Sequence, residues 1–214
     1  LAHPEKFGGN ENDSFDVIVP SLPGFGFSGS PSKPMGPRKM AEILNKLMIE
    51  NLGYKNYIAQ GGDWGATIAN WLGYDHSNSC KAIHINCLTM RHPEGPQSDE
   101  ERNWQKKFNE DQIMQEGYRT QQATKPQSLG YGMMDSPVGI AGWIIEKMHS
   151  WSDLKNNEIE SVFSKDIMLS NIMVYLVTQS FNTASWIYYG RREEGGRLLP
   201  KEDLPLKVPT AVAL

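Results

Sequence analysis

Residues 61–65 read Gly61-Gly62-Asp63-Trp64-Gly65, and the sequence changes character on either side of them. Residues 56–60 before them have the short apolar pattern of a buried strand. From Trp64 to about Tyr74, apolar residues recur at helical spacing. Glycines around a central side chain suit a sharp turn from strand to helix, because glycine tolerates close backbone approach. The pattern predicts that Asp63 projects from such a turn.

The residue at the tip of this turn has a carboxylate side chain. A tight strand-to-helix turn that exposes a nucleophile is a nucleophile elbow, and Gly61 and Gly65 are the flanking small residues that it needs. An aspartate in this position can attack an sp3 carbon and form an alkyl-enzyme ester. Asp63 therefore favours two reactions, the opening of an epoxide or the displacement of halide from carbon.

Segments around the turn alternate between strand and helix patterns. The expected strands are residues 16–20, 56–60 and 81–88, and the expected helices are residues 37–53 and 64–74. A loop rich in glycine and proline covers residues 20–28. This order predicts an α/β fold with a mostly parallel, doubly wound sheet.

The pattern changes after His92. Residues 93–200 are rich in tryptophan, methionine and glutamine, with helical stretches expected at 100–115, 138–148 and 165–183. Strand character returns over residues 206–214. We therefore expect a first core part over residues 1–92, a helical cap over 93–200 and a resumed, truncated core over 201–214. Such an insertion would cover the carboxyl ends of the core strands.

Composition excludes several classes of protein. The net charge is −4, and basic and acidic residues are interspersed without the basic stripe that nucleic acid requires. Cys80 and Cys87 form neither a disulfide framework nor a metal motif. No apolar run reaches the roughly 18 residues of a membrane span. We expect a cytoplasmic protein with no nucleic-acid partner, and a homodimer is one assembly left open.

Several separate motifs, in order, together resemble the α/β-hydrolase-fold epoxide hydrolases, in the branch related to the microsomal enzyme. The likeness covers almost the whole chain. Its carriers are the loop at residues 20–28, the elbow, and residues 117–118, 124–128, 135–139, 143–147, 151–153 and 170–175.

This resemblance implies a mechanism. The family's nucleophile matches Asp63, which would attack the less hindered epoxide carbon, and water would then hydrolyse the ester to a vicinal diol. Two acids that protonate the epoxide oxygen match Tyr118 and Tyr188. The backbone N–H of Trp64 matches one donor of the oxyanion hole. The implied reactants are a small apolar epoxide and water, in detoxification, without a metal or organic cofactor.

Other parts of the family pattern have no match in residues 1–214. The His-Gly-x-Pro loop would precede residue 1, and the acid partner and base histidine would follow residue 214. A family strand that lies between those matching residues 16–20 and 56–60 is also unmatched. None of the five histidines (His3, His76, His84, His92 and His149) stands in the required later position. We therefore interpret the sequence as an internal piece of a longer gene product.

Two other functions remain open. A haloalkane dehalogenase uses the same aspartate elbow, but halide needs N–H donors and the pair Tyr118 and Tyr188 argues against it. A binding module without a base histidine would form the ester on Asp63 and keep it.

The simplest interpretation of several other residues is structural. Tyr57, Tyr131 and Tyr175 are assigned to packing, and His84 to the core. The charge run at residues 191–194 is interpreted as a solvated helix end. Tyr189 is the main competitor of Tyr188 for the catalytic position. For Trp143 and Trp151, packing and pocket-wall roles are both open.

Overall fold

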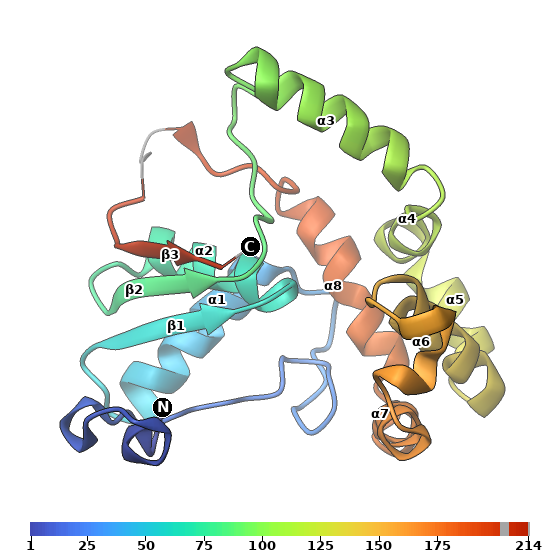
Figure 1. The fold of residues 1–214 in the computed structure, drawn as a ribbon, viewed down its shortest axis with the longest axis horizontal. Helices are drawn as coiled ribbons and strands as arrows, with labels where there is room; N and C mark the ends of the chain where they lie inside the picture. The colour runs from blue at the N-terminus through green and yellow to red at the C-terminus, as the bar shows by residue number, and fades with distance from the viewer. Residues whose placement is uncertain (202–205, 214) are drawn as a thin grey trace.

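A computed structural model describes residues 1–201 and 206–213. In these residues β1 (Tyr57–Gly61), β2 (Cys80–Ile85) and β3 (Thr210–Val212) form one parallel sheet in the order β1-β2-β3. Parallel neighbours need a crossover, and α2 (Trp64–Asp75) supplies it between β1 and β2. The chain leaves the sheet after β2 and returns as β3 (Figure 1). The predicted parallel α/β fold is confirmed.

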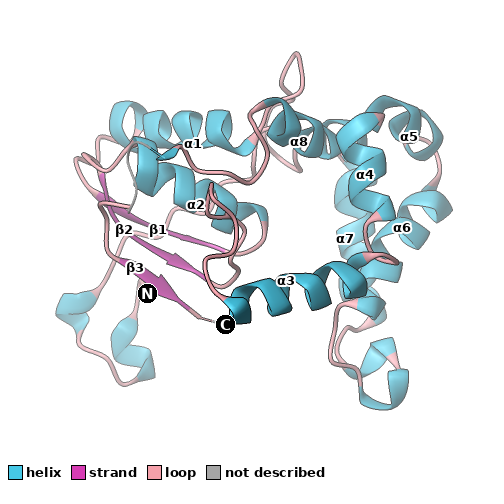
Figure 2. Cartoon of the chain, turned by 90° about the horizontal axis from the view of Figure 1, so that it is seen from above, coloured by secondary structure: helices cyan, strands magenta, loops and turns pink. Residues whose placement is uncertain are grey.

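The rest of the described chain is mostly helical. Its helices are α1 (Pro37–Lys46), α3 (Asp99–Gln112), α4 (Gly117–Thr124), α5 (Pro126–Met133), α6 (Pro137–Ser150), α7 (Lys165–Val177) and α8 (Phe181–Glu193). A π-helical turn extends α1 over Leu47–Asn51, and 3₁₀ turns lie at Pro4–Phe7, Glu11–Asp13, Lys155–Asn157 and Ile159–Ser161. Helices α1 and α2 lie against one face of the sheet, and α4–α8 form a group beside it (Figure 2).

Two apolar clusters organise the interior. The larger joins buried residues of α1, α2 and the sheet, including Met40, Trp71 and Ile83. The smaller lies within the helical group around Ile140, Ile172 and Phe181. Helix α8 contributes to both clusters, with Ile187 in the larger and Phe181 in the smaller. This helix therefore connects the two parts of the interior.

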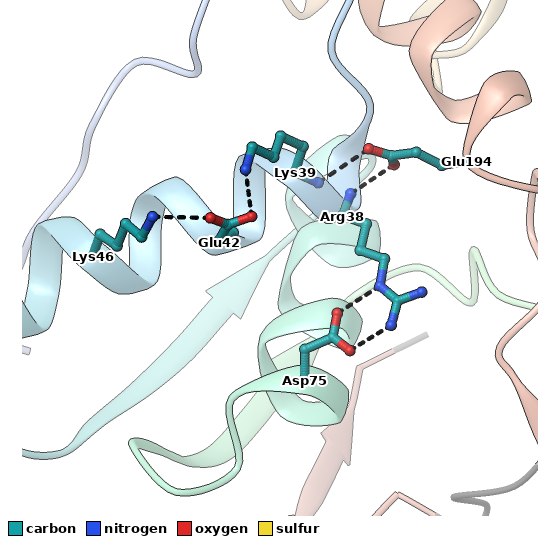
Figure 3. A network of polar contacts seen from close by, with 6 residues as sticks. All are labelled: Arg38, Lys39, Glu42, Lys46, Asp75 and Glu194. Atoms are coloured by element: carbon teal, nitrogen blue, oxygen red, sulfur yellow. Dashed lines mark hydrogen bonds and ion pairs between the residues drawn. The ribbon is translucent and has the colours of Figure 1, made fainter.

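The carboxyl end of α8 caps the start of α1. Helix α1 has Gly36 at its N-cap and Pro37 at its first position, so it lacks a side-chain cap of its own. Glu194, just after α8, accepts hydrogen bonds from the backbone N–H groups of Arg38 (2.9 Å) and Lys39 (3.1 Å), as Figure 3 shows. A carboxylate there satisfies donors that the helix leaves unpaired and meets the positive end of its dipole.

Close backbone contact reinforces this cap. A Cβ atom on Gly190 would overlap the backbone of Met35 and Gly36, so only glycine permits the observed approach. On the α2 side, Arg38 donates two hydrogen bonds of 2.7 Å to the carboxylate of Asp75 (Figure 3). We refer to the contacts of Gly190 and Glu194 with the start of α1 as the α8–α1 junction.

The predicted strand at residues 16–20 is wrong. This segment has no regular secondary structure and pairs with no strand among the described residues, and Val19 is 85% exposed. Its β-branched residues favour an extended backbone, whereas a strand also needs a neighbour to complete its hydrogen-bond ladder. The predicted final strand at residues 206–214 is confirmed only for Thr210–Val212, and Leu214 lies outside the described residues.

The helix predicted over residues 165–183 is two helices. The break follows Val177, and Gln179 has a φ of 55°, which ends the right-handed helix. The hydroxyl of Thr178 donates to the backbone oxygen of Val174 at 2.6 Å and lies 2.8 Å from the Ser180 hydroxyl. Local side-chain bonds of this kind compete with a continuous helix. The break lets α8 run in a new direction, toward α1.

Replacement of Gly190 by alanine should destabilise the protein by about 1–3 kcal/mol, because the added methyl group must push α8 away from α1. The urea midpoint of the full gene product would measure this. Gly142 in α6 is the matched control, since a Cβ there meets no atom within 4 Å. Gly142→Ala should leave the stability unchanged or raise it by up to about 1 kcal/mol. Equal midpoints for the two variants would contradict the close contact at Gly190.

Candidate functional site

The turn between β1 and α2 holds Asp63 in a strained backbone conformation. Its φ of 46° and ψ of −116° lie in a region that residues with side chains rarely occupy. A Cβ on Gly61 would overlap the backbone of Gly65, whereas a Cβ on Gly65 would meet open space. The turn therefore needs glycine at position 61, and Gly65 contributes the backbone that passes close to it. Trp64 begins α2, so its N–H has no acceptor within the helix.

The two tyrosines singled out from the sequence lie together, facing the elbow. Tyr118 is on α4 and Tyr188 is on α8, and their ring centroids are 5.8 Å apart with an angle of 85° between the planes. Tyr188 also meets the Trp64 ring edge to face, at 4.8 Å and 89°. One aromatic series thus runs from the elbow through Tyr188 to Tyr118. The structure brings together residues that are 124 positions apart in the sequence, as Trp64 and Tyr188 are.

Partial enclosure keeps both phenols protonated. Burial raises the pKa of Tyr118 and Tyr188 above the ordinary value, and the negative charge of Asp63 raises both further. A protonated phenol can donate a hydrogen bond and a proton. The pKa of Tyr175 on α7 is also raised, mainly by burial and further by the negative charge of Asp63. Its edge contact with Phe181 (6.3 Å between centroids) places it in the smaller apolar cluster.

The carboxylate of Asp63 is under opposing influences. Its side chain has an exposed face, but the protein around it removes enough water to raise the pKa of the carboxyl group. The positive charges of Arg191 and Arg197 lower that pKa and so favour the ionised form. Since only the ionised carboxylate is a good nucleophile, these arginines bear on what Asp63 can do chemically.

Tyr118 is held in place from α6 and the turn that follows it. Trp151 packs against its ring at 5.3 Å, and the ammonium of Lys147 lies 5.1 Å from the ring centroid. Lys147 and the Trp151 indole both donate to the side-chain oxygen of Gln115, at 3.4 and 3.1 Å. By contrast, Trp143 packs on Phe181 at 6.4 Å. Trp151 therefore supports the site, and Trp143 belongs to the helical interior.

Sequence analysis missed Arg191. The interpretation of residues 191–194 as a solvated helix end is right for Arg192 and Glu193, which are exposed and paired with each other. It is wrong for Arg191, whose guanidinium carbon lies 4.6 Å from the Trp64 ring centroid, and for Glu194, which caps α1. The available signal was the spacing of three residues between Tyr188 and Arg191, which puts both on one helix face.

The described residues lack the features of a metal site and of a membrane span. No group of three or more histidine, cysteine, aspartate or glutamate side chains in this part of the chain is placed to hold a metal ion. A separate finding is that none of its helices is long and apolar enough to cross a bilayer. A polar hollow of about 420 Å³ lies away from Asp63, lined by Arg38, Lys39, Glu42, Asp75, His76 and Glu194.

Comparison with known proteins identifies the family of the chain. A family model described as "alpha/beta hydrolase fold" matches residues 7–129. The chain is 38% identical over 215 residues to a candidate epoxide hydrolase of Stigmatella aurantiaca, covering 97% of this chain and 48% of that protein. It is 32% identical over 237 residues to Epoxide hydrolase 1 of Oryctolagus cuniculus, covering 100% and 52%.

A solved structure agrees with these relatives. An enantioselective mutant of the Aspergillus niger epoxide hydrolase superposes with a TM-score of 0.73 at 30% identity, over 91% of this chain and 49% of that one. The chain spans about half the length of the curated relatives that it matches. The parallel sheet, the strained aspartate turn and the family match lead to one conclusion. The chain belongs to the alpha/beta hydrolase fold family.

Proposed function

We propose that this chain carries the nucleophile and the acids of an epoxide hydrolase. The observation that supports this most is the contact series Trp64, Tyr188 and Tyr118 beside the strained Asp63. A carboxylate nucleophile faces two protonated phenols, which is the pairing that ring opening of an epoxide requires. The relatives named as epoxide hydrolases support the same reaction.

In the first step, a carboxylate oxygen of Asp63 attacks the less hindered carbon of the epoxide. The carbon–oxygen bond of the ring breaks, and its electron pair goes to the epoxide oxygen. An alkoxide is a poor leaving group, so Tyr118 and Tyr188 stabilise the developing charge and supply a proton. Their raised pKa values favour this role, since both hydroxyl groups carry a proton at neutral pH.

In the second step, water attacks the carbonyl carbon of the ester. The tetrahedral intermediate carries negative charge on oxygen, and the N–H of Trp64, which has no acceptor within α2, can donate to it. Collapse of the intermediate releases a vicinal diol and restores Asp63. We propose that the base histidine and its acid partner come from sequence outside residues 1–214.

The surroundings of Asp63 favour an apolar substrate. The rings of Trp64, Tyr188, Tyr118 and Trp151 form one contact series that begins at the residue after Asp63, and a small aryl or alkyl epoxide matches such aromatic walls. We take residues 93–200 as a cap that brings Tyr118 and Tyr188 to the core. Neither step needs a metal or an organic cofactor. The proposed compartment is the cytoplasm, in keeping with the free thiols of Cys80 and Cys87, and the proposed assembly is a homodimer.

Single-turnover hydrolysis of styrene oxide by the full gene product in oxygen-18-labelled water tests the covalent step. The label should enter the carboxylate of Asp63 and not the diol, because water attacks the ester carbonyl. Mass spectrometry of the peptide that contains Asp63 measures this. Asp63→Asn should give no ester and no diol, since asparagine fits the same backbone conformation but is not a nucleophile.

The matched control is Asp135→Asn, because Asp135 is also an exposed aspartate but follows α5. That variant should incorporate the label as the unmodified protein does. Label found only in the diol would mean that water attacks the epoxide directly, and the role proposed for Asp63 would be wrong.

Replacement of Tyr118 and Tyr188 together by phenylalanine should lower the rate of ester formation by about 10²–10⁴-fold, the range typical of acid catalysis. Each single replacement should cost less, because the second phenol still reaches the oxygen. Stopped-flow or rapid-quench kinetics with styrene oxide provides the measurement. Tyr189→Phe is the matched control, since Tyr189 packs on Arg192 at 4.7 Å rather than on Tyr118.

The same variants separate epoxide opening from dehalogenation. Halide departure needs no proton. If the protein were a dehalogenase, the double phenylalanine variant would therefore still release chloride from an alkyl chloride. Release of chloride from 1-chlorobutane by the unmodified protein, with no diol from styrene oxide, would replace the proposed function by dehalogenation.

A further inference from the structure

Arg191 is the residue of α8 whose side chain covers the ring of Trp64, directly after the elbow aspartate. It lies one helical turn after Tyr188, and its guanidinium covers the face of the Trp64 ring at 4.6 Å. Trp64 directly follows Asp63 in the sequence, so the guanidinium contacts the first residue after the proposed nucleophile. A guanidinium over an indole face is a favourable contact that also fixes the plane of both groups.

The charge of Arg191 is not neutralised by a near neighbour. Within residues 1–201 and 206–213 it makes no ion pair with a carboxylate, whereas Arg192 beside it pairs with Glu193 at 3.0 Å. Arg119 on α4 pairs with Glu116, the N-cap residue of that helix. A partly buried cation without a close partner acts on the charges that remain within reach, and the carboxylate of Asp63 is one of them.

The titratable groups that interact electrostatically with Asp63 come from several elements. Helix α4 contributes Tyr118, α7 contributes Tyr175, and α8 contributes Tyr188 and Arg191. Arg197, after α8, adds a second positive charge. Its own pKa is lowered by burial and by the charges of nearby arginines. The three phenols are neutral at neutral pH, so the arginines are the charged groups that favour the ionised form of Asp63.

We propose that Arg191 is a positioning residue of the reaction, which holds the carboxylate of Asp63 ionised and fixes the Trp64 indole beside it. The inference rests on the proposed function, in which ionised Asp63 is the nucleophile. It adds a residue that acts on Asp63 through charge and on the elbow through stacking. Arg191 does not touch the epoxide in this scheme.

The direction of the effect follows from charge. Arg191 favours the ionised form of Asp63, so its removal should raise the pKa of that carboxyl group. Less of the nucleophile would then be ionised at low pH, whereas at high pH Asp63 would be ionised in both proteins. The loss of rate should therefore depend on pH, which a simple loss of folding or packing would not produce.

The test compares four forms of the full gene product, the unmodified protein and the variants R191Q, R191K and R192Q. Each is mixed in excess with styrene oxide between about pH 5 and pH 9, quenched with acid, and assayed for ester formation by intact mass. R191Q should form the ester roughly tenfold more slowly at the acid end and approach the unmodified protein at the alkaline end. R191K, which keeps the charge, and R192Q should retain the original pH profile.

A second measurement does not depend on the reaction. Titration of the side-chain carboxyl carbons by NMR, with the Asp63 signal assigned by its loss in Asp63→Asn, should place its midpoint at a higher pH in R191Q than in R192Q. Equal midpoints, or a rate loss in R191Q that is the same at every pH, would overturn the inference. If the unmodified protein formed no ester at any pH, the proposed function would fail and the titration alone would decide the role of Arg191.

Discussion

Close packing of α8 against the first turn of α1 sets the position of the α8 residues that approach the elbow, Tyr188 and Arg191. Gly190 allows the two backbones to meet, and Glu194 fills the cap position that α1 leaves empty. Tyr188 and Arg191 are on the same rigid helix, so their contacts with Trp64 follow from that packing. The break at Gln179 frees α8 from the direction of α7 and makes the packing geometrically available.

Burial raises the pKa of both kinds of acid in this site, which favours the role of the phenols and opposes the role of Asp63. It raises the pKa of the phenols, which helps them keep the proton that ring opening needs. It also raises the pKa of Asp63, which works against the ionised nucleophile. The positive charges of Arg191 and Arg197 oppose that rise and favour the ionised carboxylate, and Arg191 also lies within electrostatic reach of both phenols.

Sequence reasoning was sufficient where the determinants are local. The glycine turn, the parallel strand order and most helices followed from spacing and from residue type. Residues 16–20 failed as a strand because a strand depends on its neighbour as well as on its own residues. Arg191 and Glu194 were missed because a run of charges looks solvated, and Glu194 meets a partner 156 residues away. The meeting of Tyr118 with Tyr188 depends on helix packing, so only the family resemblance could suggest it.

The backbone conformation at position 63 also limits how this turn can change in evolution. With φ at 46°, a β-branched side chain would be strongly strained there, so threonine is closed to it as a replacement nucleophile. Unbranched residues such as serine, cysteine or asparagine fit more easily. A single substitution at position 63 can thus place a hydroxyl or a thiol where the carboxylate now stands, without a change in the backbone of the turn. The same strain that presents the nucleophile also determines which reactions lie one mutation away.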